Sequence, residues 1–191
     1  MKRKVLAARE DLVNQILEIA EYKNLTIFGM VNDALKQIIR AEEIGLSLKD
    51  IVDQYEAIKM AKEAGFILTV ENLWYDVVNR AYQRESDKML KKWYDAGQWY
   101  GKYYTVKSQQ DPIKAFKRDA DMSIWDVSEL NIIDNGDDVL VRCISPRFPL
   151  SYTKLFSFFL EGAFNVFGYE CIERDVSKGV IRLSFKRANG E

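Results

Sequence analysis

The residues near the start of the chain that are best suited to bind a charged ligand are basic. Those that precede the first acidic residue, Glu10, are Lys2, Arg3, Lys4 and Arg9. The 191 residues together carry 28 lysines and arginines against 29 acids, a formal net charge of -1, so no global positive field points to nucleic acid or to an acidic membrane. Binding to a polyanion such as DNA would therefore have to be local, at this basic segment. A solvated basic segment with no ligand is the alternative.

The rest of the sequence offers little chemistry of the kind that enzymes use. Histidine is absent, which removes the commonest general base, zinc ligand and haem ligand. No Ser/His/Asp, Cys/His or phosphate-loop arrangement is present. The acidic groups at 42–43, 121 and 134–138 are typical of solvated loops and helix ends, and an Asn-Gly turn already explains the last of them. We therefore predict no catalytic residues, no metal site and no cofactor.

Cysteine content and hydropathy predict where the protein works. Cys143 and Cys171 lie in apolar, β-branched segments, where buried reduced thiols are expected rather than a disulfide or a metal pair. No apolar run approaches the ~18 residues that span a bilayer, and the charged start is no signal peptide. These features predict a cytoplasmic protein with no membrane partner. The few cysteines, missing histidine and dense charge would also suit a thermophile.

Two amphipathic helices follow the basic segment. Residues 10–22 place apolar side chains at spacings of three and four, and residues 26–39 do the same. The hydroxyl of Thr26 is expected to cap the second helix. We expect the basic segment to form a short strand. A short strand and two short helices cannot bury their apolar faces within one chain. This order therefore predicts that two copies of the chain intertwine.

Residues 25–35, with sequence LTIFGMVNDAL, resemble the second helix of ribbon-helix-helix repressors of the CopG/Arc/MetJ kind. Counting back without a gap places Leu12, Ile16 and Ala20 on the core face of the first helix and residues 3–8 on the ribbon. The resemblance covers about the first quarter of the chain. It implies a homodimer in which two antiparallel strands enter the major groove of double-stranded DNA.

The same resemblance implies which residues contact DNA. Alternate ribbon residues Arg3, Val5 and Ala7 would reach base edges, and the capped helix start would hold a phosphate. The full expected set is Lys2, Arg3, Lys4, Val5, Ala7, Thr26, Ile27 and Phe28. Val5 and Ala7 are apolar where the family usually carries polar groups, and Lys4 stands where it buries an aliphatic residue. A module that serves only for dimerisation is the alternative.

The remainder of the chain is expected to form a connector and a second domain. Ser47 is predicted to cap a connector helix that ends near Gly65, and Thr69 or Glu71 to cap the next helix. A further helix over about 87–104 contains Gly97 and Gly101, so another backbone or a ligand must approach that face closely. Hairpins are expected over 130–144, around Asn-Gly, and over 169–185, with an apolar helix over 155–164 between them.

Residues 91–102, with sequence KKWYDAGQWYGK, are similar to the glycine-bearing helix of the 4-vinyl reductase type domain. The similarity continues through Ser145-Pro146, residues 159–164, Phe167-Gly168 and the last hairpin with Gly179 and Phe185. It spans about residues 66–187 and implies a small-molecule sensor or an interaction platform rather than an enzyme. Asp175, Val176 and Leu183 stand in the region where the family has cysteines, which argues against a cysteine-dependent role.

The aromatic residues of this part allow two interpretations. They are either core residues or the walls of a partly open pocket for an apolar small molecule. The candidate pocket residues are Trp93, Trp99, Tyr100, Phe156, Phe159 and Phe164.

The sequence as a whole predicts an α+β protein. We expect a ribbon-helix-helix dimerisation head at 1–45, a connector helix at 46–65 and a mixed α+β domain with antiparallel hairpins at 66–191. The function expected from this order is that of a dimeric DNA-binding transcription regulator with a C-terminal sensing or interaction domain. The alternative is an assembly or ligand-binding protein that does not bind DNA and uses its head only for dimerisation.

Overall fold

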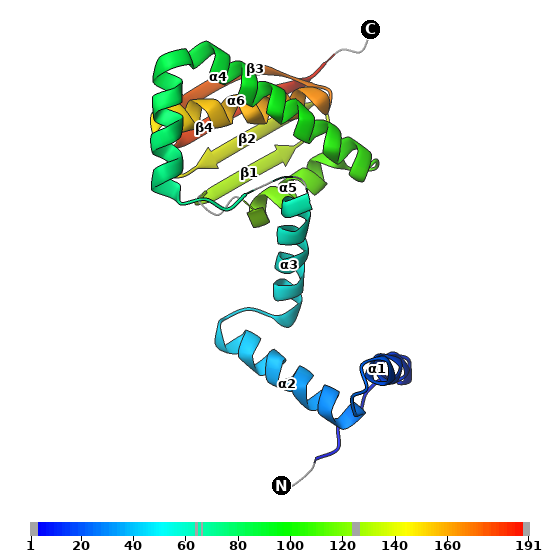
Figure 1. The fold of residues 1–191 in the computed structure, drawn as a ribbon. Coiled ribbons are helices and arrows are strands. Elements are labelled where there is room, and N and C mark those ends of the chain that lie inside the picture. Colours follow the sequence, from blue (N-terminus) through cyan, green and yellow to red (C-terminus); the bar gives the residue numbers. More distant parts are fainter. Residues whose placement is uncertain (1–3, 64, 66, 124–126, 189–191) are drawn as a thin grey trace. The chain divides into compact units, whose positions relative to one another are not determined.

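The computed structural model describes residues 4–63, 65, 67–123 and 127–188. The chain divides into two compact units, Met1–Glu56 and Ala57–Glu191, and the boundary falls inside a helix. The protein is mixed α+β, with six helices and a four-stranded antiparallel sheet among the described residues (Figure 1). None of the described helices is both long and apolar enough to cross a membrane.

The N-terminal unit begins with two helices at the predicted positions. Helix α1 spans Glu10–Tyr22 and α2 spans Ile27–Glu43. The Thr26 hydroxyl oxygen accepts a hydrogen bond from the backbone N–H of Gly29 at 3.1 Å, which confirms the predicted cap. Residues 4–9 belong to no helix or strand. A ribbon strand that would pair only with a second copy of the chain therefore stays a prediction.

Helix α3, Leu48–Glu63, is the predicted connector helix. Its start has a reciprocal cap, because the Ser47 hydroxyl accepts from the Asp50 N–H at 3.1 Å while the Asp50 carboxylate accepts from the Ser47 N–H at 3.0 Å. After it, Gly65 adopts a φ of +85°, as a residue that ends a helix often does.

Helix α4 spans Glu71–Lys107 and bends at Glu85, whose φ of -145° and ψ of 56° are not helical. Its two halves run in different directions (Figure 1), so the prediction of two successive helices here is correct in geometry. The predicted cap is wrong. Val70 occupies the N-cap position, so neither Thr69 nor Glu71 is the N-cap residue. The side chain at the N-cap position forms no hydrogen bond that caps the start of the helix.

The sheet contains the two predicted hairpins. Strands β1 (Glu129–Asp134) and β2 (Asp138–Ile144) form the first, and β3 (Tyr169–Ser177) and β4 (Val180–Arg187) form the second. The strand order is β1-β2-β4-β3, and all neighbours are antiparallel. Asp134 accepts a hydrogen bond from the Gly136 N–H at 2.8 Å, so this acidic residue serves the turn. Cys143 is buried as expected, but Cys171 is only half-buried because it lies on the edge strand β3.

Two further helices complete the C-terminal unit. Helix α5 is Pro112–Ser123, and the Asp111 carboxylate caps it by accepting from the Lys114 N–H at 2.9 Å. Helix α6, Leu150–Val166, lies between the sheet and α4 (Figure 1). Its buried residues and the inward-facing residues of β2 and β4 form the core, which includes Val141, Leu160, Phe164 and Leu183.

Glycines allow α4 and α6 to pack with their backbones in contact. A Cβ atom on Gly97 would overlap the carbonyl oxygen of Phe159, and one on Gly101 would lie 2.8 Å from that of Ala163. A Cβ atom on Gly162 would likewise overlap the carbonyl oxygen of Tyr94. The close approach that the sequence required at Gly97 and Gly101 is therefore to another helix backbone.

Candidate ligand cavity and predicted DNA-contacting residues

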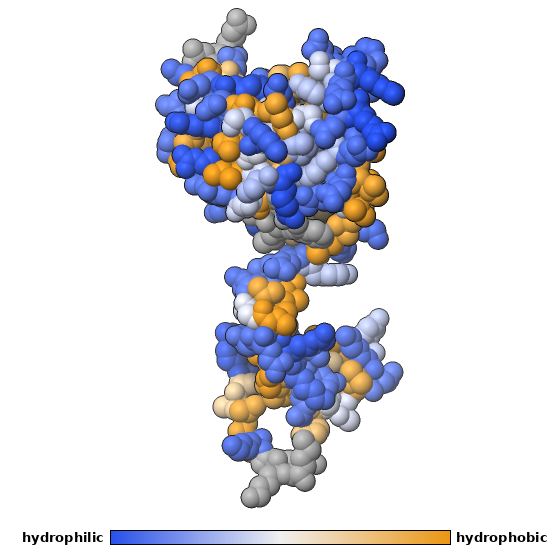
Figure 2. Space-filling view, turned by 90° about the vertical axis from the view of Figure 1, so that its left-hand side faces the viewer, coloured by the Kyte–Doolittle hydropathy of each residue, from blue (hydrophilic) through white to orange (hydrophobic). Residues whose placement is uncertain are grey.

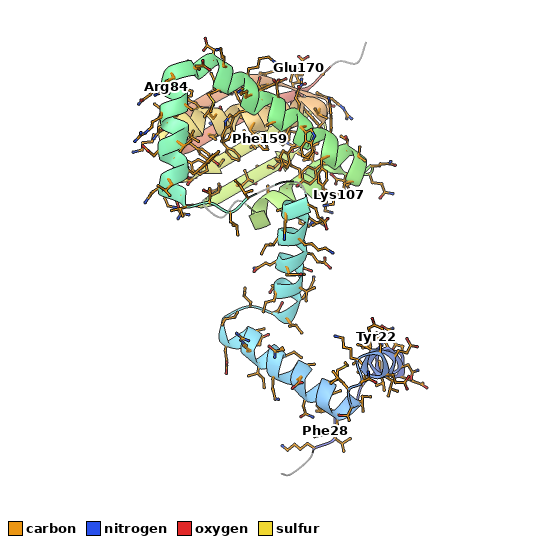
Figure 3. All side chains as sticks on the ribbon, viewed as in Figure 1. Tyr22, Phe28, Arg84, Lys107, Phe159 and Glu170 are labelled. Atoms are coloured by element: carbon orange, nitrogen blue, oxygen red, sulfur yellow. The ribbon has the colours of Figure 1, made fainter. Side chains whose placement is uncertain are left out.

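A cavity of about 610 Å³ lies within the C-terminal unit. Its walls come from the segment before α4, both halves of α4, helix α5, the loop before α6 and α6 itself, whose Phe159 is labelled in Figure 3. The volume lies within the ~300–1,000 Å³ range of small-molecule sites. The bend in α4 matters here, because both of its halves contribute residues to one cavity.

Most of the described lining residues are aromatic. They are Trp74, Tyr75, Trp93, Tyr100, Tyr104, Phe116, Tyr152, Phe156 and Phe159. Their rings also hold one another in place through edge contacts. Tyr152 contacts Tyr75 at a centroid distance of 4.9 Å and Trp93 at 5.3 Å, and Tyr100 contacts Phe159 at 5.4 Å. Such pairs fix ring orientation beyond what apolar burial alone provides, so the walls are preorganised.

Among the described residues, only two charged side chains line this cavity, and they pair with each other. A guanidinium nitrogen of Arg147 lies 3.0 Å from a carboxylate oxygen of Glu71. The pair joins the start of α4 to the loop before α6. Because the two charges compensate each other, the wall presents no net charge to an occupant.

Two tyrosine hydroxyls of the wall, those of Tyr100 and Tyr104, have raised pKa values. Burial raises the pKa of Tyr100 to about 12. Burial, followed by the nearby charge of Asp119, also raises the pKa of Tyr104 far above its ordinary value. The phenols therefore add polar hydroxyl groups to the wall but no charge at neutral pH.

A Tyr100→Phe variant is expected to lose less stability than the parent protein between pH 10 and pH 12, because the folded-state pKa of Tyr100 is raised from 10.0 to about 12. Above pH 10 the unfolded chain releases this proton first, so the native state loses stability as the pH rises through that interval. The midpoint of urea unfolding measured against pH would show the difference. Tyr82→Phe, on the same helix but outside the cavity wall, is the control for loss of a tyrosine hydroxyl.

The structure brings four of the six predicted pocket residues together. Trp93, Tyr100, Phe156 and Phe159 line the cavity. Trp99 does not, since it is 54% exposed and stacks on Tyr103 at 6.2 Å. Phe164 is fully buried in the core against Phe185, with ring centroids 4.8 Å apart.

On α4, helical spacing distinguishes the aromatic residues that line the cavity from Trp99, which does not. Gly97 and Gly101 mark the face that packs on α6. Trp93, Tyr100 and Tyr104 stand three or four residues from one or other glycine and share that face, whereas Trp99 is two residues from each. Residues Trp74, Tyr75 and Tyr152 had no such local signal. Only the fold brings the first half of α4 and the start of α6 to the same cavity.

The structure locates part of the predicted DNA-contacting set. Lys2 and Arg3 lie outside the described residues. Lys4, Val5 and Ala7 are exposed. At the start of α2, Thr26 forms the cap, and Ile27 occupies the first turn with Phe28, which is labelled in Figure 3.

The two helices α1 and α2 leave large apolar side chains uncovered within one chain. Besides Tyr22 and the first-turn residues Ile27 and Phe28, the exposed apolar residues of these helices are Leu12, Leu17, Ile19, Leu35, Ile38 and Ile39, all at least 37% exposed. Figure 2 shows apolar residues at the surface of both units. Only Ala20 of α1 and Ala41 of α2 are buried.

Comparisons with known proteins do not identify a family for this chain. No protein-family model matches the chain, and no curated protein matches its sequence. The fold and the cavity define an α+β protein with a small-molecule-sized, aromatic-walled site.

Proposed function

We propose that the protein is a dimeric DNA-binding transcription regulator with a ribbon-helix-helix head and a C-terminal unit that senses a small molecule. The observation that carries this proposal is the pair of short amphipathic helices, α1 and α2, whose apolar side chains stay largely uncovered within one chain. Helices that expose such a face are stable when a second element covers it. A second copy of the chain supplies an identical, self-complementary face.

The expected dimer would also create the DNA-binding surface. Residues 3–8 of two copies would pair as an antiparallel ribbon, because each strand would satisfy the backbone groups of the other. A two-stranded ribbon fits the major groove, where Arg3 would bind guanine through two hydrogen bonds. The start of α2, capped by Thr26, would hold a backbone phosphate with its N–H groups and dipole.

The second candidate function is that of an assembly or ligand-binding protein that does not bind DNA. The observation that favours it lies in the predicted ribbon. Val5 is 98% exposed, and it stands with Ala7 at positions where a reading strand needs donors or acceptors. In this case the head would serve only to join two C-terminal units.

An Arg3→Ala variant is expected to lose roughly 10- to 100-fold in affinity for its DNA site while remaining dimeric, since one bidentate contact to guanine contributes that much discrimination. The site would first be selected from a random duplex pool. Affinity would then be measured against salt concentration, where each phosphate contact steepens the loss of binding. Lys23→Ala, an exposed basic residue outside the expected contact set, is the control. Absence of any enriched sequence, and of affinity at low salt, would favour the second candidate.

A further inference from the structure

The chain that leaves the connector helix forms part of the cavity wall. Helix α3 ends at Glu63 and α4 begins at Glu71, and between them Ile67, Leu68 and Thr69 line the cavity. These three residues belong to the C-terminal unit and are covalently continuous with the helix that leads to the N-terminal unit. Only a short stretch of chain separates Ile67 from the end of α3 at Glu63.

The side chains of this wall segment are poorly covered. Ile67 is 81% exposed and Leu68 is 77% exposed, whereas the lining residues Tyr104, Phe116 and Phe156 on the opposite helices are buried. One side of the cavity is thus packed and preorganised, and the other is a short segment with apolar surface still in contact with water. An apolar occupant that touches both sides would remove this surface from water, which is favourable in proportion to the area covered.

The walls select for a neutral aromatic molecule. Aromatic rings dominate the lining, and neighbouring rings already meet edge to face, an arrangement that a further flat ring extends. An anionic ligand would lose its hydration here, while the one basic side chain among the described lining residues, Arg147, is already paired with Glu71. The aromatic faces could still attract a cation, and the tetraethylammonium measurement below tests this alternative. The cavity volume of about 610 Å³ suits a ligand of two or three rings.

We infer that a neutral aromatic molecule binds in this cavity and that its occupancy is transmitted to α3 through the wall segment Ile67–Leu68–Thr69. This inference deepens the sensing role proposed above and rests on it for its biological meaning. Binding would favour the state in which the wall segment is packed against the ligand. The end of α3 is then held in one position, and any ligand that binds this state better shifts the population towards it.

The binding part of the inference is tested with N-phenyl-1-naphthylamine, a neutral aromatic probe whose fluorescence rises in apolar surroundings, added to the full chain. We expect saturable binding and a higher melting temperature, because the probe binds only the native state. Phe159→Leu, which removes an aromatic ring from the wall, should weaken binding roughly 2- to 10-fold. Phe158→Leu is the control, since Phe158 is the neighbouring residue on α6 and does not line the cavity.

The role of the wall segment is tested with a second matched pair. Leu68→Ser should weaken probe binding roughly fivefold, because it removes apolar contact area. Leu73→Ser makes the same change at a leucine that is 66% exposed but does not line the cavity, and should leave the affinity unchanged. Hydrogen exchange of the full chain should show probe-dependent protection at residues 67–69 and in the last turn of α3.

Three outcomes would overturn the ligand assignment: no binding to the folded chain, equal affinity in all four variants, or a rise in melting temperature with tetraethylammonium instead of the naphthylamine. Protection confined to α4, α5 and α6 would overturn transmission through the wall segment. None of these measurements involves DNA. Absence of DNA binding in the Arg3 experiment would therefore contradict the proposed regulator role. It would not affect the result of the probe-binding and hydrogen-exchange measurements.

Discussion

A Gly162→Ala variant is expected to lose at least about 3 kcal/mol of unfolding free energy, because overpacking two backbones in contact lies at the costly end of core substitutions. The added Cβ atom would overlap the carbonyl oxygen of Tyr94 and come within 3.0 Å of the backbone nitrogen of Gln98. Neither atom belongs to a side chain that can rotate away. Helix α6 would have to move off α4, and the core contacts between them and the shape of the cavity would change together.

Urea unfolding followed by circular dichroism would measure this loss, and Gly168→Ala is the matched control. Gly168 has a φ of +88°, and no described atom lies within 4 Å of the place that a Cβ atom would take, so alanine there meets backbone strain but no neighbour. That strain costs about 1–2 kcal/mol. Equal losses in the two variants would contradict the close packing of α4 on α6. A Gly162→Ala protein that keeps its stability would do the same.

An Ile38→Asp variant is expected to raise the dissociation constant of the proposed dimer by roughly 1,000-fold or more. Ile38 is 41% exposed in the single chain and lies on the apolar face of α2. Burying an isoleucine side chain contributes about 2 kcal/mol, and a two-fold interface contains the substitution twice. The new carboxylate would in addition have to give up its hydration at the interface.

Sedimentation velocity over a range of protein concentrations would measure this effect. Gln37→Asp introduces the same charge one residue away, at an exposed polar position, and should leave the dimer intact. A parent chain that is monomeric at all concentrations would contradict the proposed head. A dimer that survives Ile38→Asp would place the interface elsewhere.

The elements that the sequence predicts well depend on contacts between near neighbours in the chain. Thr26 and Ser47 both act as helix caps, since a cap needs only a side-chain acceptor and an N–H group three residues on. The Asn-Gly turn between β1 and β2 is equally local, because Gly136 supplies the positive φ that the turn requires. The cap predicted at Thr69 or Glu71 is wrong. The N-cap residue there is Val70, whose side chain cannot accept a hydrogen bond, so no local side-chain signal marks the start of α4.

The cavity could be predicted only in part, because its residues come from distant segments. Their aromatic character on one helix makes Trp93 and Tyr100 candidates, but the same criterion includes Trp99, which is exposed and does not line the cavity. The same criterion also includes Phe164, although packing against Phe185 of the sheet places it in the core. Aromatic side chains suit a core, a surface contact and a pocket equally well, so residue type alone does not distinguish these environments.

The order of residues indicated the α+β class, the bounds of α1, the hairpins and the need for a close approach at Gly97 and Gly101. It did so because periodicity, caps, turns and small residues act over a few neighbouring positions. The fold is needed to show that the bend at Glu85 and the crossing of α4 with α6 help to enclose an aromatic cavity, and that the segment after α3 forms one of its walls. These features depend on contacts between segments tens of residues apart. Gly97 and Gly101 mark a packing face on α4, but no local pattern specifies which segment packs against it.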